Sequence, residues 1–199
     1  MATVTVLLAL ERFSAQDRCV AATKLKQNKQ LVLLRHAKSS WDDPFIEDFD
    51  RPLAKRGRKA AARLATWLKQ HRVRPDLILC SPAVRTRETL ALIVDALGEK
   101  ADIAYDKALY LAEADALLAK IQAADNAAAC VMLIGHNPGM HELALSLLKP
   151  GAKGDRGRLE EKFPTAAIAR FKVPVAHWAD LQPGEAALVD FIKPADLDD

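Results

Sequence analysis

Short apolar runs that end in polar or basic residues recur along the chain, and they set the expected positions of its β-strands. Three of these runs have the length of a buried strand: residues 31–34, 77–80 and 131–134. The segments that directly follow them are Arg35-His36, Ser81 to Arg85, and Gly135 to Pro138. A buried charge without a partner is costly, so a strand that leads into an arginine and a histidine indicates an anion site at its end. We therefore predict that the three strand ends meet around one phosphoryl group.

Between these runs, apolar residues return at helical intervals, and turn-forming residues separate the elements. Helices are predicted over about 55–71, 82–97, 113–124 and 139–148, and further strands over 102–105, 165–173 and 185–192. Ser81-Pro82 and Asn137-Pro138 each place a capping side chain before a proline at the first helical position, so both pairs predict helix starts. The charged, glycine-containing segment 151–162 predicts a surface loop.

The order of the predicted elements indicates an α/β protein. Strands alternate with helices, which is typical of a parallel or mixed sheet with helices on both faces. A chain of 199 residues, half of them hydrophobic, is long enough for one such domain with an ample core. Ligands of these sheets bind beyond the carboxyl ends of the strands, and all three polar segments lie at such ends.

The net charge of +3 belongs entirely to the N-terminal part of the chain. Residues 1–30 contain five basic and two acidic residues, so the charges of the other 169 residues sum to zero. This distribution predicts no nucleic-acid partner, because such partners require a broad basic field. A membrane-spanning helix requires about 20 consecutive apolar residues, and every apolar run in this sequence is much shorter. We therefore also expect no membrane partner.

Residues 1–30 are interpreted as an N-terminal extension, either poorly ordered or the product of a start codon placed too early. Residues 31–193 are expected to form a single domain, and residues 194–199 an acidic tail. The basic residues of the extension would also suit an organellar transit peptide, but Glu11 and Asp17 disfavour that alternative. Two of the three cysteines lie in apolar runs, which favours buried free thiols and a cytoplasmic, reducing location.

Arg35 and His36 together suit phosphoryl transfer. A neutral imidazole whose second nitrogen is held by a hydrogen bond can attack phosphorus, and water can then hydrolyse the resulting phosphohistidine. The neighbouring guanidinium can lower the pKa of the imidazole and bind the phosphoryl oxygens. His36 could instead be a core histidine that is satisfied by the backbone.

Arg85 and His136 supply further positive donors. Arg85 falls in the first turn of its predicted helix, where a cation opposes the helix dipole unless an anion binds to both. His136 precedes another helix start and is expected to donate to the phosphoryl oxygens, as an imidazolium in the transition state. Alone, Arg85 could be solvated and His136 could cap a helix. Their joint occurrence with Arg35 and His36 favours a phosphate site that needs no metal.

The same segments resemble the histidine phosphatase superfamily. The matching motifs are Leu-Arg-His-Ala-Lys-Ser at 34–39, Ser-Pro-x-x-Arg-x-x-x-Thr at 81–89 and Gly-His-Asn-Pro at 135–138. Four shorter motifs are similar to the SixA-type phosphohistidine phosphatases in particular: Arg51-Pro-Leu, Arg56-Gly, Leu109-Tyr and Phe163-Pro-Thr-Ala. The resemblance covers residues 31 to 193, approximately.

This resemblance implies a three-layer α/β/α sandwich with a mostly parallel mixed central sheet, the phosphoglycerate mutase-like fold. It also implies a phosphatase without metal or cofactor that forms a covalent phosphohistidine intermediate. His36 then corresponds to the nucleophile, and Arg35, Arg85 and His136 correspond to the phosphate pocket. Arg51 matches an arginine that approaches the phosphate in the SixA branch; otherwise it would be an ordinary loop residue.

Two positions depart from the superfamily pattern. Ala37 stands where glycine usually follows the histidine, and Leu111 stands where similar sequences often have a glutamate. Glu113 remains as a candidate proton donor, but an acid in a first helical turn is also a normal structural feature. The P–N bond of phosphohistidine is already labile, so a missing acid favours a phosphohistidine substrate over an alkyl phosphate.

Three functions remain open. We favour a phosphohistidine phosphatase that acts on a phosphorylated protein, because no large insertion caps the site. The second is the same chemistry on a small phosphorylated metabolite, with segments 42–50 and 151–162 as lids, although both could be solvated connections. The third is a phosphate- or phosphoprotein-binding module without catalysis, and the presence of His36 argues against it.

Overall fold

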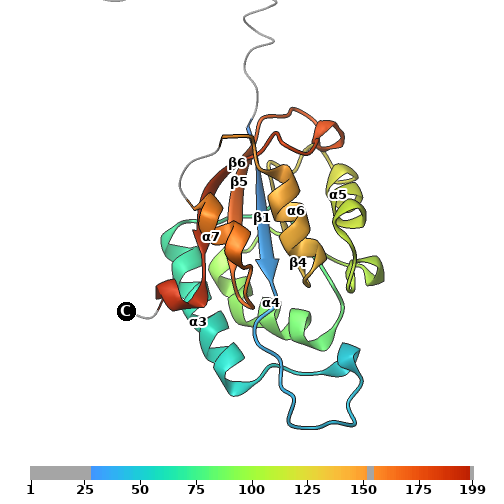
Figure 1. Ribbon diagram of the computed structural model, residues 1–199, viewed down its shortest axis with the longest axis vertical. Helices are drawn as coiled ribbons and strands as arrows, with labels where there is room; N and C mark the ends of the chain where they lie inside the picture. Colours follow the sequence, from blue (N-terminus) through green and yellow to red (C-terminus); the bar gives the residue numbers. More distant parts are fainter. Residues whose placement is uncertain (1–27, 152–154, 198–199) are drawn as a thin grey trace, which may run out of the picture.

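A six-stranded mixed sheet forms the centre of the protein in the computed structural model, which describes residues 28–151 and 155–197 (Figure 1). The strands are β1 (Lys29–Arg35), β2 (Leu77–Cys80), β3 (Asp102–Tyr105), β4 (Cys130–Gly135), β5 (Ile168–Val173) and β6 (Ala187–Ile192). Their order across the sheet is β3-β2-β4-β1-β5-β6. β1 to β4 are parallel, and β5 is antiparallel to both of its neighbours. The predicted mostly parallel mixed sheet is thus confirmed.

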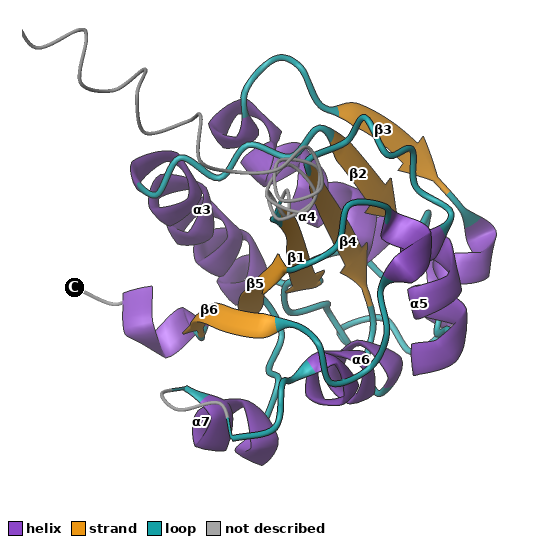
Figure 2. Cartoon of the chain, turned by 90° about the horizontal axis from the view of Figure 1, so that it is seen from above, coloured by secondary structure: helices purple, strands orange, loops and turns teal. Residues whose placement is uncertain are grey.

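Helices cover both faces of the sheet and complete the predicted three-layer α/β/α sandwich (Figure 2). One face carries α3 (Lys55–Gln70) and α4 (Val84–Leu97). The other carries α5 (Ala114–Gln122), α6 (Gly139–Leu147) and α7 (Arg156–Glu161). Short 3-10 helices occur at η1 (Asp48–Asp50), η2 (Lys107–Leu109), η3 (Trp178–Asp180) and η4 (Pro194–Leu197).

β1 is buried on both faces, which explains its continuous apolar sequence. Leu31 and Leu33 belong to the core beneath α5 and α6, and Val32 and Leu34 belong to the core beneath α3 and α4. This division follows from the alternation of side chains along a strand. All four side chains are fully buried, and each contributes on the order of 2 kcal/mol of transfer free energy. The strand is therefore anchored in the cores on both faces of the sheet, which holds the residues at its end, Arg35 and His36, in a defined position.

The carboxyl ends of β1 and β4 lie side by side where their connections leave the sheet in opposite directions. Arg35 pairs with Gly135 in the parallel register, and Cys80 of β2 pairs with Ile134. β1 leads to α3 on one face, whereas β4 leads to α6 on the other. In open α/β sheets, this kind of divergence creates the crevice that binds ligands.

The backbone that leaves β1 is packed tightly against the start of α3. Ala54 N donates to Lys38 O over 2.8 Å. A Cβ atom on Gly57 would lie only 2.1 Å from the same carbonyl oxygen, so a larger residue there would force the backbone apart. Glycine at this position thus allows the helix to hold the segment after β1 in place.

The helix after β2 begins later than predicted. α4 starts at Val84 with Ala83 as its N-cap, so the prediction that Ser81 caps this helix is wrong. The hydroxyl of Ser81 instead lies 2.8 Å from Nε2 of His136, which is 55 positions away in the sequence. Arg85 remains in the first turn of the helix, as expected.

The helix after β4 begins at the predicted residue, but its N-cap differs from the predicted one. α6 starts at Gly139 with Pro138 as its N-cap, so the prediction that Asn137 caps it is wrong. The Asn137 side chain donates through Nδ2 to Phe163 O over 3.0 Å. In both cases a long-range hydrogen bond takes the place of the local cap.

The ends of several elements differ from the predicted ones. β1 begins at Lys29, two residues before the predicted strand, because Lys29 and Gln30 pair with Val173 and Lys172 of β5. Lys29 Nζ also donates to the carbonyl oxygens of Asn126 and Ala128. The predicted surface loop 151–162 includes the short helix α7. The residues of η4 lie against α3. Residues 1–27 lie outside the described part of the chain, so their interpretation as an extension stays a prediction.

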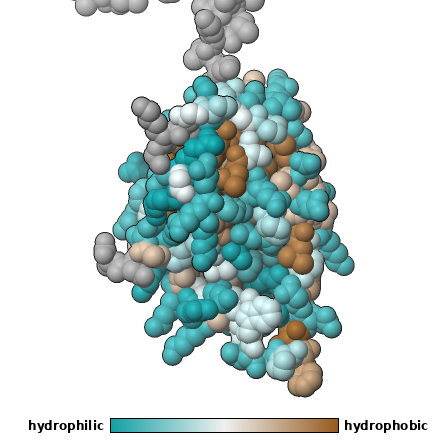
Figure 3. Space-filling view, in the orientation of Figure 1, coloured by the Kyte–Doolittle hydropathy of each residue, from teal (hydrophilic) through white to brown (hydrophobic). Residues whose placement is uncertain are grey.

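Cys80 and Cys130 are buried free thiols, as predicted, whereas Cys19 lies outside the described residues. Burial raises the pKa of each of the two described thiols to about 12, so neither is a reactive thiolate. Within residues 28–151 and 155–197, no helix has the length and apolar character needed to cross a bilayer. The face shown in Figure 3 is mainly hydrophilic, but its lower tip carries hydrophobic side chains over the loop that follows β1.

Candidate active site

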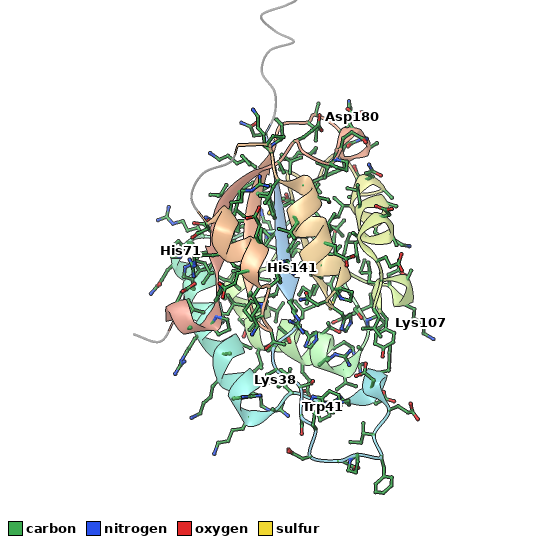
Figure 4. All side chains as sticks on the ribbon, in the orientation of Figure 1. Lys38, Trp41, His71, Lys107, His141 and Asp180 are labelled. Atoms are coloured by element: carbon green, nitrogen blue, oxygen red, sulfur yellow. The ribbon has the colours of Figure 1, made fainter. Side chains whose placement is uncertain are left out.

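The four side chains predicted to bind a phosphoryl group line one pocket at the carboxyl ends of β1 and β4. Arg35, His36, Arg85 and His136 surround a cavity of about 320 Å³, which we call the phosphoryl pocket. The centroids of the two imidazole rings lie 5.1 Å apart. Other residues that line the pocket are Lys38, Ser39, Trp41, Asp48, Leu111, Asn137 and Thr165. Figure 4 shows Lys38 and Trp41 near one another, below the end of β1.

His36 keeps one ring nitrogen available for chemistry. Its Nδ1 lies 2.7 Å from Ala37 O, and a carbonyl oxygen can only accept, so Nδ1 carries the proton and Nε2 keeps a lone pair. Burial lowers the pKa of His36 to about 3; the Ala37 carbonyl opposes this shift, while His136 and the two arginines of the pocket add to it. The ring is therefore neutral at physiological pH and is oriented by the backbone.

His136 has one satisfied and one unsatisfied ring nitrogen. Nε2 lies 2.8 Å from Ser81 Oγ, whereas Nδ1 is buried and has no hydrogen-bond partner among the described residues. Burial, followed by the charge of Arg85, lowers the pKa of His136 to about 3, against the opposing charge of Asp48. When Ser81 donates its hydroxyl proton to Nε2, Nδ1 carries a hydrogen that can be donated to an anion. A buried donor without a partner is costly, which favours a ligand at this position.

A carboxylate faces the guanidinium group of Arg85. Asp48 Oδ2 accepts from Arg85 Nη2 over 2.8 Å and from Tyr110 Oη over 2.7 Å, and Arg85 Nη1 also donates to Asp48 O. Burial alone raises the pKa of Asp48, but the hydrogen bonds from Tyr110 and Arg85 outweigh it and hold this pKa below its usual value. Asp48 is therefore ionised, and its charge offsets that of Arg85.

Arg35 is less completely paired. Its Nη1 donates to Phe163 O over 2.9 Å, but its Nε is buried and has no partner within the described chain. Burial, together with the charge of Arg85, lowers the pKa of Arg35. Two guanidinium groups that disfavour each other's charge would be stabilised by an anion between them. This is the arrangement expected of a site for a tetrahedral oxyanion.

Arg51 lies behind the wall of the phosphoryl pocket. Its Nε and Nη2 donate to Ser40 O over 2.9 and 2.6 Å, and its guanidinium carbon lies 3.0 Å from the ring centroid of Trp41. Its Nη1 is 3.6 Å from Asp48 Oδ1. Arg51 thus contacts two residues that line the pocket without being among the lining residues itself. Its predicted approach to the phosphate stays a prediction.

Glu113 is exposed and is not among the residues that line the phosphoryl pocket. It is the N-cap residue of α5, and its side chain makes no capping hydrogen bond. Leu111 reaches the pocket from the same segment, with a backbone φ of 51°. The geometry therefore gives the predicted proton-donor role of Glu113 no support.

Sequence reasoning missed the roles of Ser81 and Asp48 in this site. The local sequence predicts a helix cap at Ser81, although its position directly after a strand end places it at the ligand-binding edge. Asp48 was one of several acids in a loop, and its sequence neighbours gave no sign that it meets Arg85. The nearby Arg51-Pro-Leu motif was the only available signal, because it marked this loop as one that approaches the phosphate.

Acidification is expected to destabilise the fold through His36 and His136. Both pKa values are about 3 in the folded protein and near the ordinary 6.5 in the unfolded chain. The unfolded state therefore binds more protons below pH 6.5, so the free energy of unfolding falls as the pH drops through 6.5 toward 3. At pH 5 the expected loss is about 2 kcal/mol for each histidine. Urea unfolding at pH 7.5 and pH 5 measures it.

The matched control for this measurement is His136→Gln, which removes one of the two titrating groups. Its free energy of unfolding should depend less on pH than that of the unchanged protein over the same interval. Inorganic phosphate should reduce the pH dependence as well, because a bound anion stabilises the imidazolium forms. Equal pH dependence of both proteins would contradict the assignment of a neutral, buried His136.

An α/β/α sandwich that gathers two histidines and two arginines at the carboxyl ends of its parallel strands has the architecture of a phosphatase of the phosphoglycerate mutase-like fold. The sequence model of the histidine phosphatase superfamily (branch 1) matches residues 31–141. This chain belongs to that family, as its motifs predict.

Similar proteins extend the match over most of the chain. An uncharacterized protein of Mycobacterium tuberculosis strain H37Rv is 38% identical over 163 residues, which are 81% of this chain and 99% of that protein. A candidate phosphohistidine phosphatase SixA from Nakamurella multipartitia has a similar structure, with a TM-score of 0.73 and 31% identity over 84% of this chain and 96% of its own. The protein histidine phosphatase SixA in complex with tungstate matches with a TM-score of 0.68 and 26% identity, over 84% of this chain and 99% of its own. The chain is therefore SixA-like within the histidine phosphatase superfamily.

Proposed function

We propose that this protein is a phosphohistidine phosphatase that acts on a phosphorylated protein through a covalent intermediate on His36. The observation that carries the proposal is the state of His36. It is a buried, neutral imidazole whose Nδ1 is bound to a backbone carbonyl, and it lines the same pocket as two guanidinium groups. The activity is assigned to a single domain that spans residues 31–193.

In the first step, Nε2 of His36 attacks the phosphorus atom of the substrate. A bond forms between Nε2 and phosphorus, and the bond between phosphorus and the leaving atom breaks, with its electron pair going to the leaving group. Arg35, Arg85 and the Nδ1 donor of His136 bind the three equatorial oxygens, whose charge they stabilise more strongly as the transfer proceeds. The hydrogen bond to Ala37 O stabilises the positive charge that develops on the ring of His36.

In the second step, water attacks the phosphorus atom of phosphorylated His36. The P–N bond breaks, its electron pair returns to Nε2, and inorganic phosphate leaves together with the proton released by the water. The same donors bind the equatorial oxygens in both steps, so no rearrangement of the pocket is required.

The pocket favours a leaving group that needs little protonation. Asp48 is ionised, and Glu113 does not line the pocket, so neither is a ready proton donor. An imidazole leaving from a phosphohistidine depends less on an acid than an alkoxide does, because its P–N bond is labile. This chemistry supports phosphohistidine over an alkyl phosphate as the substrate.

The charges of the pocket also support a mechanism without metal. Phosphoryl transfer requires positive donors around the equatorial oxygens, and metal ions supply them in many enzymes. Here two guanidinium groups and the Nδ1 donor of His136 line the pocket and can bind these oxygens. We propose that these side chains bind the transferred group without a divalent ion.

A small phosphorylated metabolite is the alternative substrate. Part of the pocket lining comes from the loop after β1, through Trp41 and Asp48, and from Leu111 before α5. These side chains could enclose a compact leaving group. A binding module without catalysis is a weaker alternative, because the free Nε2 of His36 would then serve no purpose.

A direct comparison of substrates tests the proposed function. We expect the protein to hydrolyse a phosphohistidine peptide with a higher kcat/KM than an aryl phosphate, and an aryl phosphate with a higher kcat/KM than sugar phosphates. Each rate should be unchanged by a chelator. A preference for one sugar phosphate would support the metabolite alternative, and loss of activity in chelator that a divalent ion restores would refute the metal-free mechanism.

A further inference from the structure

A second, larger hollow adjoins the phosphoryl pocket. Its volume is about 760 Å³, and it shares Arg35, Lys38 and Thr165 with the pocket. We call it the basic groove. One wall is the exposed face of α3, and the other is formed by Lys162, Pro164 and the residues at 193–195. A molecule that places a phosphoryl group in the pocket therefore has the basic groove directly beside it.

The basic groove concentrates positive charge. Arg56, Lys59 and Arg63 follow one another at helical intervals of three and four residues, so they form a stripe along one face of α3. Seven residues of helix rise about 10 Å, so the stripe is longer than a single phosphate requires. Lys162 and Lys193 stand on the opposite wall. None of the described residues that line this groove is acidic, although Lys193 Nζ lies 3.2 Å from Glu161.

Large apolar side chains are exposed on the loop that borders the phosphoryl pocket. Trp41 is 72% exposed and Phe45 is 93% exposed, and Trp41 lines the pocket itself. Figure 3 shows hydrophobic atoms at this lower tip, to the right of the hydrophilic surface over α3. Leu111, at the pocket, is 49% exposed. Exposed aromatic side chains beside a charged groove are typical of surfaces that bind proteins.

We propose that the basic groove and these apolar side chains form a docking surface for an acidic protein whose phosphorylated side chain enters the phosphoryl pocket. This inference rests on the proposed phosphatase function and adds the charge of its substrate. Basic side chains on both walls attract an acidic segment and align it beside the pocket. Trp41 and Phe45 give the partner apolar contact, which a nucleic acid backbone or an inorganic polyphosphate would not use.

The test compares two synthetic peptides that carry one chemically phosphorylated histidine each. The flanking residues are glutamate and aspartate in one peptide and serine in the other. We expect the KM of the acidic peptide to be about tenfold lower at low salt, because several exposed charge pairs of modest strength act together. The difference should shrink at high salt, where such pairs are screened. The values of kcat should remain similar.

Lys59→Glu/Lys162→Glu reverses one charge on each wall of the groove. We expect about a tenfold increase in the KM of the acidic peptide, with less than a twofold change in the kcat/KM of an aryl phosphate. The matched control is Lys69→Glu/Lys100→Glu, which changes the net charge equally. Neither residue lines the groove, and both lie near the end of the sheet away from the pocket. Thermal melting of both variants shows that they are folded.

Several outcomes would overturn the docking surface. Equal KM values for the two peptides, or an equal effect of the control variant, would show that the groove does not select acidic partners, while leaving the phosphatase function intact. Competition by polyphosphate or a DNA oligonucleotide at lower concentrations than by the unphosphorylated acidic peptide would indicate a different occupant. If neither phosphohistidine peptide is hydrolysed while aryl phosphate is, the proposed substrate fails and this inference fails with it.

Discussion

His36→Ala is expected to lower kcat by a factor on the order of 10⁴ or more, because it removes the atom that accepts the phosphoryl group. Phosphate or vanadate binding should be weaker but still detectable, since Arg35, Arg85 and His136 remain in the pocket. Acid-labile, alkali-stable phosphate on the unchanged protein after rapid quenching would reveal the intermediate. The variant should show none.

His71→Ala is the matched control for this experiment. His71 is an exposed histidine at the end of α3 that stacks on Trp67, far from the phosphoryl pocket. It should retain normal turnover and a normal phosphoenzyme signal. Near-normal activity of His36→Ala would show that another group is the nucleophile. Complete loss of oxyanion binding in that variant, with the fold intact, would show that His36 mainly binds phosphate.

The location of the main site residues at one edge of the sheet could be predicted from the sequence, because parallel strands require it. Continuous apolar runs indicated buried parallel strands, and parallel strands place their carboxyl ends at one edge. Residues that directly follow such runs, such as His36 and His136, then lie at the same edge of the sheet whatever the exact helix boundaries are. The structure adds that β1 and β4 are neighbours, which brings these residues together. In the structure, Arg35 at the end of β1 pairs with Gly135 at the end of β4, so the residues that follow these two strands start from adjacent positions.

The contacts that could not be predicted are those between residues that no local pattern connects. Asp48 meets Arg85 across 37 positions and Tyr110 across 62, through a loop whose path depends on the packing of everything around it. Ser81 has the local features of a helix cap, but its hydroxyl is engaged by His136. Sequence rules for caps describe what a side chain can do locally, and a buried partner elsewhere can outweigh them.

The phosphoryl pocket and the basic groove are expected to recognise different parts of the substrate. In the proposed function, the phosphoryl pocket, with its two imidazoles and two guanidinium groups, recognises the group that is transferred. In the proposed docking, the basic groove would select the molecule that carries that group, because Lys59 and Lys162 line the groove and not the pocket. Substitutions in the pocket should therefore affect all substrates, and those in the groove only large acidic ones.

Arg85→Ala is expected to lower kcat/KM for every phosphorylated substrate by about 10²- to 10³-fold. Part of this loss comes from the removal of two donors to the phosphoryl oxygens. A second part comes from Asp48, whose carboxylate now bonds to Arg85 Nη2. Without Arg85 it would keep only Tyr110 Oη and the more distant Arg51 Nη1, so its negative charge would be less well balanced beside the incoming phosphoryl group. Steady-state kinetics with an aryl phosphate measures the total.

The double variant Arg85→Ala/Asp48→Asn separates the two contributions. Removing the negative charge of Asp48 should restore kcat/KM by about tenfold relative to Arg85→Ala alone, which a double-mutant cycle with Asp48→Asn measures directly. Asp48→Asn alone should bind inorganic phosphate or vanadate more tightly, because the anion no longer competes with a carboxylate for Arg85. Glu47→Gln, in the same loop, should change neither quantity. If Asp48→Asn is as impaired as Arg85→Ala, then Asp48 positions the guanidinium for catalysis, and the competition between carboxylate and phosphate is excluded.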